Sequence, residues 1–157
     1  SAIHGGMTAI ELKDLDLAYA PPYSSAKDPV NMAGFMVENI AKGLVKQFHV
    51  EDIEKIPRDR SVTLLDVRTA EEYAKGHVEG FYNIPVDELR DRLKELEPGK
   101  RVYLICQSGL RSYIAARILE ENGYEACHLA GGFRFYDAVM NDRGLIDSAA
   151  PCGMDQG

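Results

Sequence analysis

The sequence Val102-Tyr-Leu-Ile-Cys106-Gln-Ser-Gly-Leu-Arg111-Ser112 joins a short apolar run to a polar loop and then to a segment with helical periodicity. The run before the cysteine follows Pro98-Gly99 and is too short for a helix, so it predicts a buried strand. After Gly109 the apolar residues recur at 3.6-residue spacing, which predicts a helix. Cys106 is therefore expected at the carboxyl end of a strand, where open α/β sheets place their ligand sites.

The loop between this strand and this helix has the composition of an anion site built around a thiol. A tight turn at Gly109 can direct backbone N–H groups inward, and the helix N-terminus adds a partial positive charge. Arg111 adds a full one, so every neighbour favours a thiolate. We interpret Cys106 as a nucleophile rather than as a buried structural cysteine, the alternative for this residue type. The predicted catalytic residues are Cys106 and Arg111, and the predicted anion-binding residues are Gln107, Ser108, Gly109, Leu110 and Ser112.

Four motifs, in order along the chain, resemble those of rhodanese-type sulfurtransferases. The six residues from Cys106 to Arg111 resemble the active-site loop of that family. Leu65-Asp-Val-Arg68 with Glu71-Glu-Tyr73 is similar to its DVR-x-x-x-E-(Y/F) motif. Gly76-His-Val-Glu-Gly80 with Asn83-Ile-Pro85, and Leu129-Ala-Gly-Gly-Phe133, are similar to its two remaining motifs. The resemblance covers about residues 45–141, and it implies that Cys106 carries sulfur as a persulfide.

Strand and helix patterns alternate through residues 46–143, which we assign to the rhodanese-like domain. This alternation predicts an α/β fold with a central parallel five-stranded sheet and helices on both faces. Thr69 is the expected N-cap of a helix over 70–75, with Glu72 completing a capping box. The expected strands cover residues 46–50, 62–66, 81–83, 102–105 and 126–129. Further helices are expected over 86–96, from Gly109 to Asn122, and over 133–140.

Residues 1–31 do not fit this alternation. Ala18 to Gly34 resembles the end of the dimerisation domain of flavin-dependent pyridine nucleotide–disulfide oxidoreductases, nearest to the CoA-disulfide reductase and NADH oxidase group. Some of these enzymes carry a rhodanese domain at the C-terminus. The resemblance implies that Tyr19 or Tyr23 lies near the redox cysteine and the CoA thiol of the whole enzyme. We expect residues 1–31 to be a remnant of that domain, 32–45 a linker helix that begins after Asp28 and continues to Leu44, and 144–157 a flexible tail.

The resemblance implies FAD, NAD(P)H and CoA for a full-length homodimeric fusion. No GxGxxG dinucleotide fingerprint occurs in these residues, so we expect no cofactor in this chain itself. The expected partners are a small sulfur donor, such as thiosulfate, polysulfide or a persulfide, and a thiol acceptor such as CoA.

The bulk composition excludes several classes of function. A net charge of −7 and a pI near 5.1 disfavour binding to nucleic acid or to an anionic membrane. No apolar run is long enough to predict a membrane span. Three cysteines without a CxxC pair predict a reducing, cytoplasmic setting and no structural zinc.

Three residues outside the loop have two readings each. Asp66 and Arg68, at the end of the second strand, belong either to the pocket wall or to a structural ion pair, and the sequence favours the ion pair. His77 has the chemistry of a general base, yet a thiolate stabilised by amide dipoles needs none. The family resemblance places His77 in a structural turn.

Two rival functions remain at this stage. Phosphatases and arsenate reductases on the same scaffold also use a cysteine–arginine loop, but a tetrahedral phosphate needs one more loop residue than a sulfur atom. A non-catalytic docking domain of the reductase is the other rival, and the presence of both Cys106 and Arg111 disfavours it.

Overall fold

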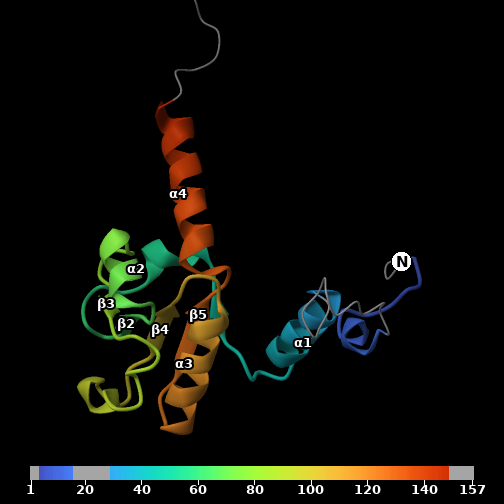
Figure 1. Cartoon of the computed structure of the whole chain (residues 1–157), viewed down its shortest axis with the longest axis horizontal. Helices are drawn as coiled ribbons and strands as arrows, with labels where there is room; N and C mark the ends of the chain where they lie inside the picture. The colour runs from blue at the N-terminus through green and yellow to red at the C-terminus, as the bar shows by residue number, and fades with distance from the viewer. Residues whose placement is uncertain (1–3, 16–28, 149–157) are drawn as a thin grey trace, which may run out of the picture. The chain divides into compact units, whose positions relative to one another are not determined.

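The computed structural model describes residues 4–15 and 29–148, and the side chains of 4–15 and 30–142 (Figure 1). The chain divides into two compact units, Ser1–Lys46 and Gln47–Gly157. No helix in the described part of the chain is long and apolar enough to cross a membrane.

The larger unit is built on a five-stranded sheet in which every neighbouring pair is parallel. This confirms the predicted architecture. The strands are β1 (Gln47–Phe48), β2 (Thr63–Asp66), β3 (Tyr82–Asn83), β4 (Val102–Ile105) and β5 (Ala126–Leu129). The order across the sheet is β1-β5-β4-β2-β3, so β4 is the central strand. A central parallel strand is covered on both faces, which explains why β4 is almost wholly apolar.

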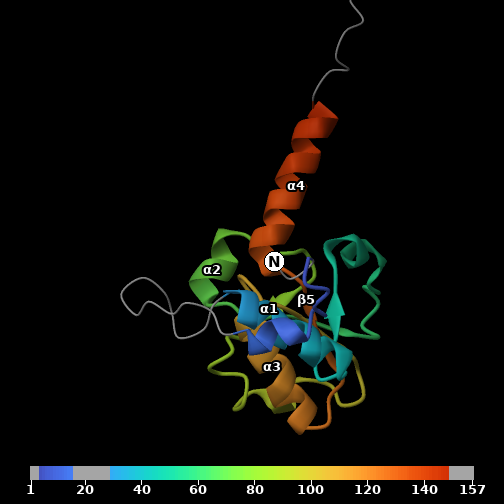
Figure 2. The ribbon, with the colours of Figure 1, turned by 90° about the vertical axis from the view of Figure 1, so that its right-hand side faces the viewer.

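Alternation along the strands divides the core into two layers. Leu104 and Cys106 pack on the face covered by α3 (Leu110–Glu121), together with Leu65, Ala126 and Leu119. Ile105 points to the other face, where it joins a second cluster with Phe48 and Leu129. That face is covered by the 3-10 helix Val50–Lys55 and by side chains from the first turns of α4 (Gly132–Ser148). Figures 1 and 2 show the rest of α4 projecting beyond the larger unit. The period of two in the strands therefore decides which side chains face the loop-bearing helix α3.

The short helix α2 (Ala70–Lys75) begins with the predicted capping box. The Thr69 hydroxyl accepts from the Glu72 amide at 3.2 Å, and the Glu72 carboxylate accepts from the Thr69 amide at 2.9 Å. Two otherwise unpaired helix donors are satisfied in this way. The box also fixes the direction of the Glu72 side chain.

The predicted helix over 86–96 is wrong. This segment is a series of turns that ends in a 3-10 helix, Leu93–Glu95. Its backbone bonds are mostly of the i to i−3 type, and the Tyr124 hydroxyl donates to the Leu93 carbonyl at 3.2 Å. Leu89 and Leu96 are nevertheless buried, so the apolar pattern is met by turns that tertiary contacts hold.

Helix α4 is longer than predicted. It continues to Ser148, eight residues beyond the expected end at Met140, so residues 144–148 of the predicted flexible tail are helical. No proline occurs in this segment before Pro151, and the Asn141 amide donates to the Asp137 carboxylate one turn earlier at 3.3 Å. Nothing in this stretch therefore ends the helix at Met140.

The smaller unit pairs the 3-10 helix Glu11–Asp14 with α1 (Pro29–Ala41). The Asn31 side-chain amide donates to the carbonyls of Leu12, Lys13 and Leu15 at 3.0–3.1 Å. Helix α1 ends at Ala41 rather than at the predicted Leu44. Gly43 has a φ of +67°, and the Leu44 amide donates to the Asn39 carbonyl at 2.9 Å, a glycine-based helix end. Tyr19, Tyr23 and the predicted cap Asp28 lie outside the described residues.

The central strand supplies a test of the core. Leu104→Ala removes a fully buried side chain, so we expect the free energy of unfolding to fall by about 2–5 kcal/mol. Leu110→Ala, the same change at a leucine that is 68% exposed, serves as the control and should change it by less than about 0.5 kcal/mol. Urea denaturation followed by circular dichroism measures both. Equal losses in the two variants would contradict the layer assignment.

Candidate active site

Cys106 follows the last residue of the central strand and is 1% exposed. Its Sγ accepts a hydrogen bond from the Gly109 amide at 3.1 Å and lies 3.2 Å from the Ser112 hydroxyl oxygen. Gly109 has a φ of +115°, a conformation that residues with a Cβ rarely adopt. The chain therefore turns back over the sulfur within three residues. Of the loop amides predicted to face the anion, that of Gly109 makes the contact.

The loop is held from behind by the first turn of α4. The amides of Phe133 and Arg134 donate to the carbonyls of Cys106 and Gln107 at 2.7 and 3.1 Å. Gly132 lies so close to this loop that a Cβ there would be 2.6 Å from the Cys106 carbonyl oxygen. Gly132 is thus required twice, by this approach and by its φ of +66°. These two loop carbonyls accept hydrogen bonds from α4, and the opposite side of the loop faces α3.

The Arg111 side chain forms an ion pair with Glu72. Its two terminal nitrogens donate to the two carboxylate oxygens at 2.6 and 2.7 Å, and both side chains are about 30% exposed. The guanidinium lowers the pKa of Glu72 to about 2, and the carboxylate raises the pKa of Arg111. A further contribution to the raised pKa of Arg111 comes from Cys106, so the guanidinium interacts electrostatically with the sulfur. The capping box of α2 therefore also orients the arginine of the loop.

Asp66 and Arg68 form a buried ion pair, as the sequence favoured. The Arg68 guanidinium donates to both Asp66 oxygens at 2.7–3.0 Å and to the Gly76 carbonyl at 2.7 Å. It also lies over the Phe133 ring, 3.9 Å from the centroid, and its remaining nitrogen is 3.4 Å from the Gln107 side-chain oxygen. The pair thus connects the end of β2 to the loop and to the start of α4. Its contacts are those of a support behind the loop.

Behind Ser112 lies a row of polar groups that continues away from the sulfur. The Ser112 hydroxyl donates to the Gly109 carbonyl at 3.0 Å and is 3.5 Å from His128 Nδ1. His128 Nε2 in turn is 3.4 Å from the side-chain amide nitrogen of Gln47, its neighbour in β1. Ser112 and His128 are 0% and 5% exposed, and burial lowers the pKa of His128. Buried polar groups are retained where they are bonded to one another.

The other residues singled out from the sequence differ in their exposure and contacts. Ser108 and Leu110 are exposed on the outer side of the loop, and Gln107 is half-buried. His77 is exposed, stacks on Tyr73 with 4.0 Å between ring centroids and has its Nδ1 3.2 Å from the Tyr73 carbonyl oxygen. Cys127 is buried in β5, as expected, and Cys152 lies outside the described residues.

Sequence reasoning missed the roles of Glu72 and His128. The sequence predicts Glu72 as a helix cap, but the pairing of Glu72 with a residue 39 positions later has no local signal. For His128 the sequence does contain a signal. It alternates with Cys127 in β5, so it shares the face of Ala126 and must point toward α3.

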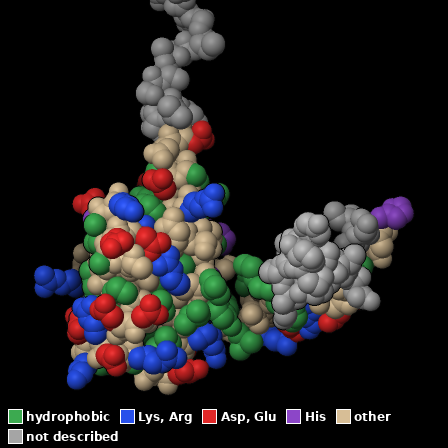
Figure 3. Space-filling model, viewed as in Figure 1, with side chains coloured by type: hydrophobic (Ala, Val, Ile, Leu, Met, Phe, Trp, Pro, Cys, Tyr) green, Lys and Arg blue, Asp and Glu red, His purple; other side chains and the backbone are tan. Residues whose placement is uncertain are grey.

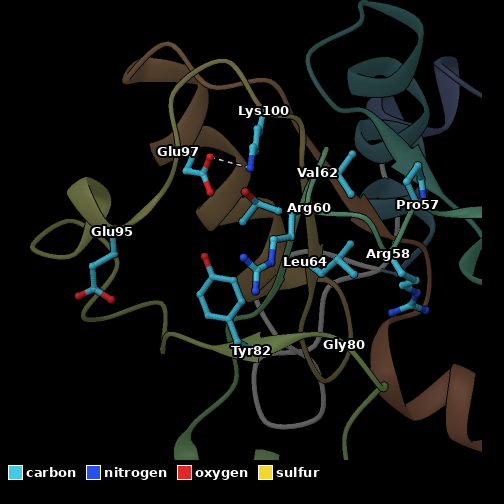
Figure 4. Close-up of a pocket in the computed structure, with 11 residues that line it drawn as sticks. Pro57, Arg58, Arg60, Val62, Leu64, Gly80, Tyr82, Glu95, Glu97 and Lys100 are labelled. Carbon is cyan, nitrogen blue, oxygen red and sulfur yellow. Dashed lines mark ion pairs between the residues drawn. The ribbon is translucent and has the colours of Figure 1, made fainter.

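A hollow of about 310 Å³ lies at the other end of the sheet, by Thr63 at the start of β2 (Figure 4). Cys106 follows the opposite, carboxyl end of β4, so the hollow is separate from the sulfur site. Its lining residues are Pro57, Arg58, Arg60, Val62, Thr63, Leu64, Gly80, Tyr82, Glu95, Glu97 and Lys100. Lys100 is paired with Glu97 at 2.6 Å, so the charges in this hollow are mixed.

Mixed charge is also the pattern of the face of the larger unit that Figure 3 shows. In the view of Figure 3, acidic and basic side chains are interspersed over the larger unit. A face of mixed charge creates no strong single-sign field. Among the described side chains, no group of three or more His, Cys, Asp or Glu residues is arranged to hold a metal ion.

Comparison with known proteins gives a family match. The model of the rhodanese-like domain matches residues 49–138. Thiosulfate sulfurtransferase PspE of Escherichia coli (strain K12) is 39% identical over 72 residues, which cover 45% of this chain and 69% of PspE. YqhL of Bacillus subtilis (strain 168) is 43% identical over 76 residues, covering 48% of this chain and 60% of YqhL.

Two solved structures are similar over most of the chain. Reduced CoADR-RHD of Bacillus anthracis superposes with a TM-score of 0.84 at 46% identity, covering 90% of this chain and 25% of that one. A NAD-dependent persulfide reductase from A. fulgidus superposes with a TM-score of 0.73 at 40% identity, covering 85% and 24%. A likeness over 90% of the chain includes residues outside 49–138. The chain spans about a quarter of the length of either protein.

The contact between Gly132 and the loop can be tested against a matched glycine. Gly132→Ala should destabilise the fold by about 1–2 kcal/mol for its φ alone, and by more because the Cβ meets the Cys106 carbonyl. Gly123→Ala shares a positive φ, +81°, but its Cβ would meet nothing within 4 Å. Urea denaturation of both variants measures the difference. If the two lose the same stability, the loop does not depend on the close approach.

The Glu72–Arg111 pair predicts a dependence of stability on pH. The folded-state pKa of Glu72 is about 2, below its ordinary 4.5, so its stabilising contribution is present above pH 4.5 and is lost as the pH falls toward 2. Because the pair is partly exposed, we expect a contribution of about 1 kcal/mol. Glu72→Gln should therefore lose less stability than the wild type between these pH values. Denaturation at several pH values measures it, and parallel curves would contradict the assignment.

Proposed function

The chain belongs to the rhodanese-like domain family, and from this membership we propose that residues 46–143 act as a sulfurtransferase in which Cys106 carries the sulfur. The observation that supports this most directly is the position of Cys106 Sγ, at the end of the central strand and within reach of the Gly109 amide and the Ser112 hydroxyl. Both groups can donate to an anionic sulfur. Donors fixed in advance around a developing charge are the usual source of such stabilisation.

The reaction proceeds in two balanced steps. The Cys106 thiolate attacks the outer sulfur of a donor such as thiosulfate, and the S–S bond of the donor breaks with its electron pair on the departing sulfite. Cys106 is left as an anionic persulfide. An acceptor thiolate then attacks the outer sulfur and forms a persulfide of its own, and Cys106 departs as the thiolate. The proton of the resting Cys106 thiol goes to solvent, and no external oxidant is consumed.

Arg111 contributes charge in this proposal rather than a direct contact. Its terminal nitrogens are held by Glu72, and its guanidinium interacts electrostatically with Cys106. A fixed positive charge beside the loop favours the thiolate, the persulfide and the arrival of an anionic donor. Glu72 offsets part of this charge and keeps the guanidinium in one orientation.

We further propose that the chain functions within a reductase–rhodanese fusion. The likeness to Bacillus anthracis CoADR-RHD and to the A. fulgidus persulfide reductase, which extends beyond the family domain, supports this. FAD, NAD(P)H and CoA belong to the proposal only through that longer, homodimeric protein, where CoA is the sulfur acceptor or donor. A cytoplasmic, reducing setting is part of the same proposal, and the sequence supports it with three cysteines that form no CxxC pair.

Mass spectrometry of the chain tests the persulfide directly. We expect Cys106 to gain the mass of one sulfur atom after exposure to thiosulfate, polysulfide or CoA persulfide, each supplied separately. The donor that modifies Cys106 at the lowest concentration identifies the donor class. Cys106→Ser should abolish both the adduct and thiosulfate:cyanide sulfurtransferase activity.

Cys127→Ser is the matched control, because Cys127 is the other buried cysteine among the described residues. It should keep both the adduct and the activity. Sulfur transfer that persists in Cys106→Ser would overturn the proposal. So would Cys106-dependent hydrolysis of an aryl phosphate in the absence of any persulfide.

A further inference from the structure

In the row of polar groups from Gln47 to Cys106, the chemistry of each group decides which partner donates and which accepts the hydrogen bond. The nitrogen of the Gln47 side-chain amide can only donate, so His128 Nε2, 3.4 Å away, must accept. A neutral imidazole that accepts at Nε2 carries its hydrogen on Nδ1. Nδ1 therefore donates to the Ser112 hydroxyl oxygen at 3.5 Å.

The hydroxyl of Ser112 is thereby left with one hydrogen and a choice of acceptor. In the resting thiol, that hydrogen goes to the Gly109 carbonyl at 3.0 Å, and the thiol donates to the hydroxyl oxygen at 3.2 Å. The Gly109 carbonyl also accepts from the Tyr113 amide at 2.9 Å, as part of helix α3. The hydroxyl hydrogen can therefore leave this carbonyl without leaving it unpaired.

We propose that Ser112 is a positioning residue whose hydroxyl hydrogen rotates from the Gly109 carbonyl to the sulfur when Cys106 becomes an anion, and that His128 holds it there. No proton crosses the chain of groups. Only the O–H bond turns, and the Gln47 and His128 hydrogens keep their places. The anion then receives two donors, the Gly109 amide and the Ser112 hydroxyl. The inference rests on the proposed function only in taking this anion to be the thiolate and the persulfide of a sulfurtransferase.

The surroundings of His128 keep it neutral, as this arrangement requires. The imidazole is buried between β1 and α3, and burial lowers its pKa, with a smaller opposite effect from a backbone hydrogen bond at Leu129. The charged groups near the sulfur are the Arg111–Glu72 and Asp66–Arg68 pairs, each internally compensated. Gln47, the neighbour of His128 on β1, is uncharged.

Ser112→Ala removes the second donor and tests the rotation. We expect the pH midpoint of thiolate formation to rise by about one unit, roughly a tenfold smaller thiolate-to-thiol ratio at a given pH below it. Ultraviolet thiolate absorbance of the 157-residue chain, with Cys106→Ser subtracted as the blank, measures this midpoint. Ser112→Thr keeps the hydroxyl and should restore it. An unchanged midpoint in Ser112→Ala would overturn the proposal.

Two variants at His128 test its part. His128→Asn retains a donor near the position of Nδ1 and should keep the midpoint close to the wild type, whereas His128→Phe retains the ring without a donor and should raise it. Cys127→Ala, a buried change in the same strand but on its other face, is the control and should not move it. Equal midpoints in all three variants would exclude a role for His128.

The hydrogen on His128 can also be located without any substitution. Nitrogen NMR of the imidazole should show Nδ1 protonated and Nε2 bare at neutral pH, and the reverse tautomer would overturn the proposal even if His128→Phe fails to fold. Mass spectrometry of the wild-type persulfide separates this question from the proposed function. If the wild type forms the persulfide but the pH midpoint of thiolate formation is unchanged in Ser112→Ala, only the proposed rotation is overturned. If the midpoint rises in Ser112→Ala but no donor gives a persulfide in the wild type, only the proposed sulfurtransferase function is overturned.

Discussion

The backbone contact between the start of α4 and the loop after β4 is the constraint on which the site depends. The Phe133 and Arg134 amides take up the carbonyls of Cys106 and Gln107, which fixes the orientation of both peptide units. With the carbonyls turned toward α4, the sulfur lies on the side that faces α3, where Gly109 and Ser112 reach it. The approach is possible because Gly132 has no side chain. The same contact ties the end of the central strand to the helix that covers the other face of the sheet.

The charges near the loop are arranged in pairs, and the groups that touch the sulfur are neutral. Asp66 compensates Arg68 inside the protein, and Glu72 compensates Arg111 at its edge. An unpaired charge at the buried Asp66 or Arg68 would carry a large desolvation cost, which pairing reduces. Stabilisation of an anion at Cys106 can then come from N–H and O–H dipoles that need no counter-charge of their own. The proposed anion site therefore needs no excess of basic side chains, in keeping with a chain whose net charge is −7.

Much of this structure was predictable from local patterns. The five strands follow from short apolar runs, the capping box from Thr69 and Glu72, and the place of Cys106 from a strand that ends in a glycine turn. The prediction failed where tertiary contacts override local preference. Residues 86–96 have the apolar spacing of a helix, yet Tyr124 binds their carbonyls and turns satisfy the same burial. Pairs such as Glu72–Arg111, 39 positions apart, depend on how helices pack and have no sequence signature in one chain.

The geometry of the loop also bears on the choice between sulfur and phosphate. A tetrahedral phosphate bears several anionic oxygens and needs a ring of donors with a free cation, usually a bidentate arginine. In the described loop, one backbone amide and one hydroxyl reach the sulfur, and the bidentate face of Arg111 is already occupied by the Glu72 carboxylate. Two donors suit a single anionic atom. The loop between Cys106 and Arg111, only six residues long, closes around that atom and leaves the arginine outside the first ring of contacts. Contact geometry therefore favours the same chemistry as the length of the loop, and it does so on independent grounds.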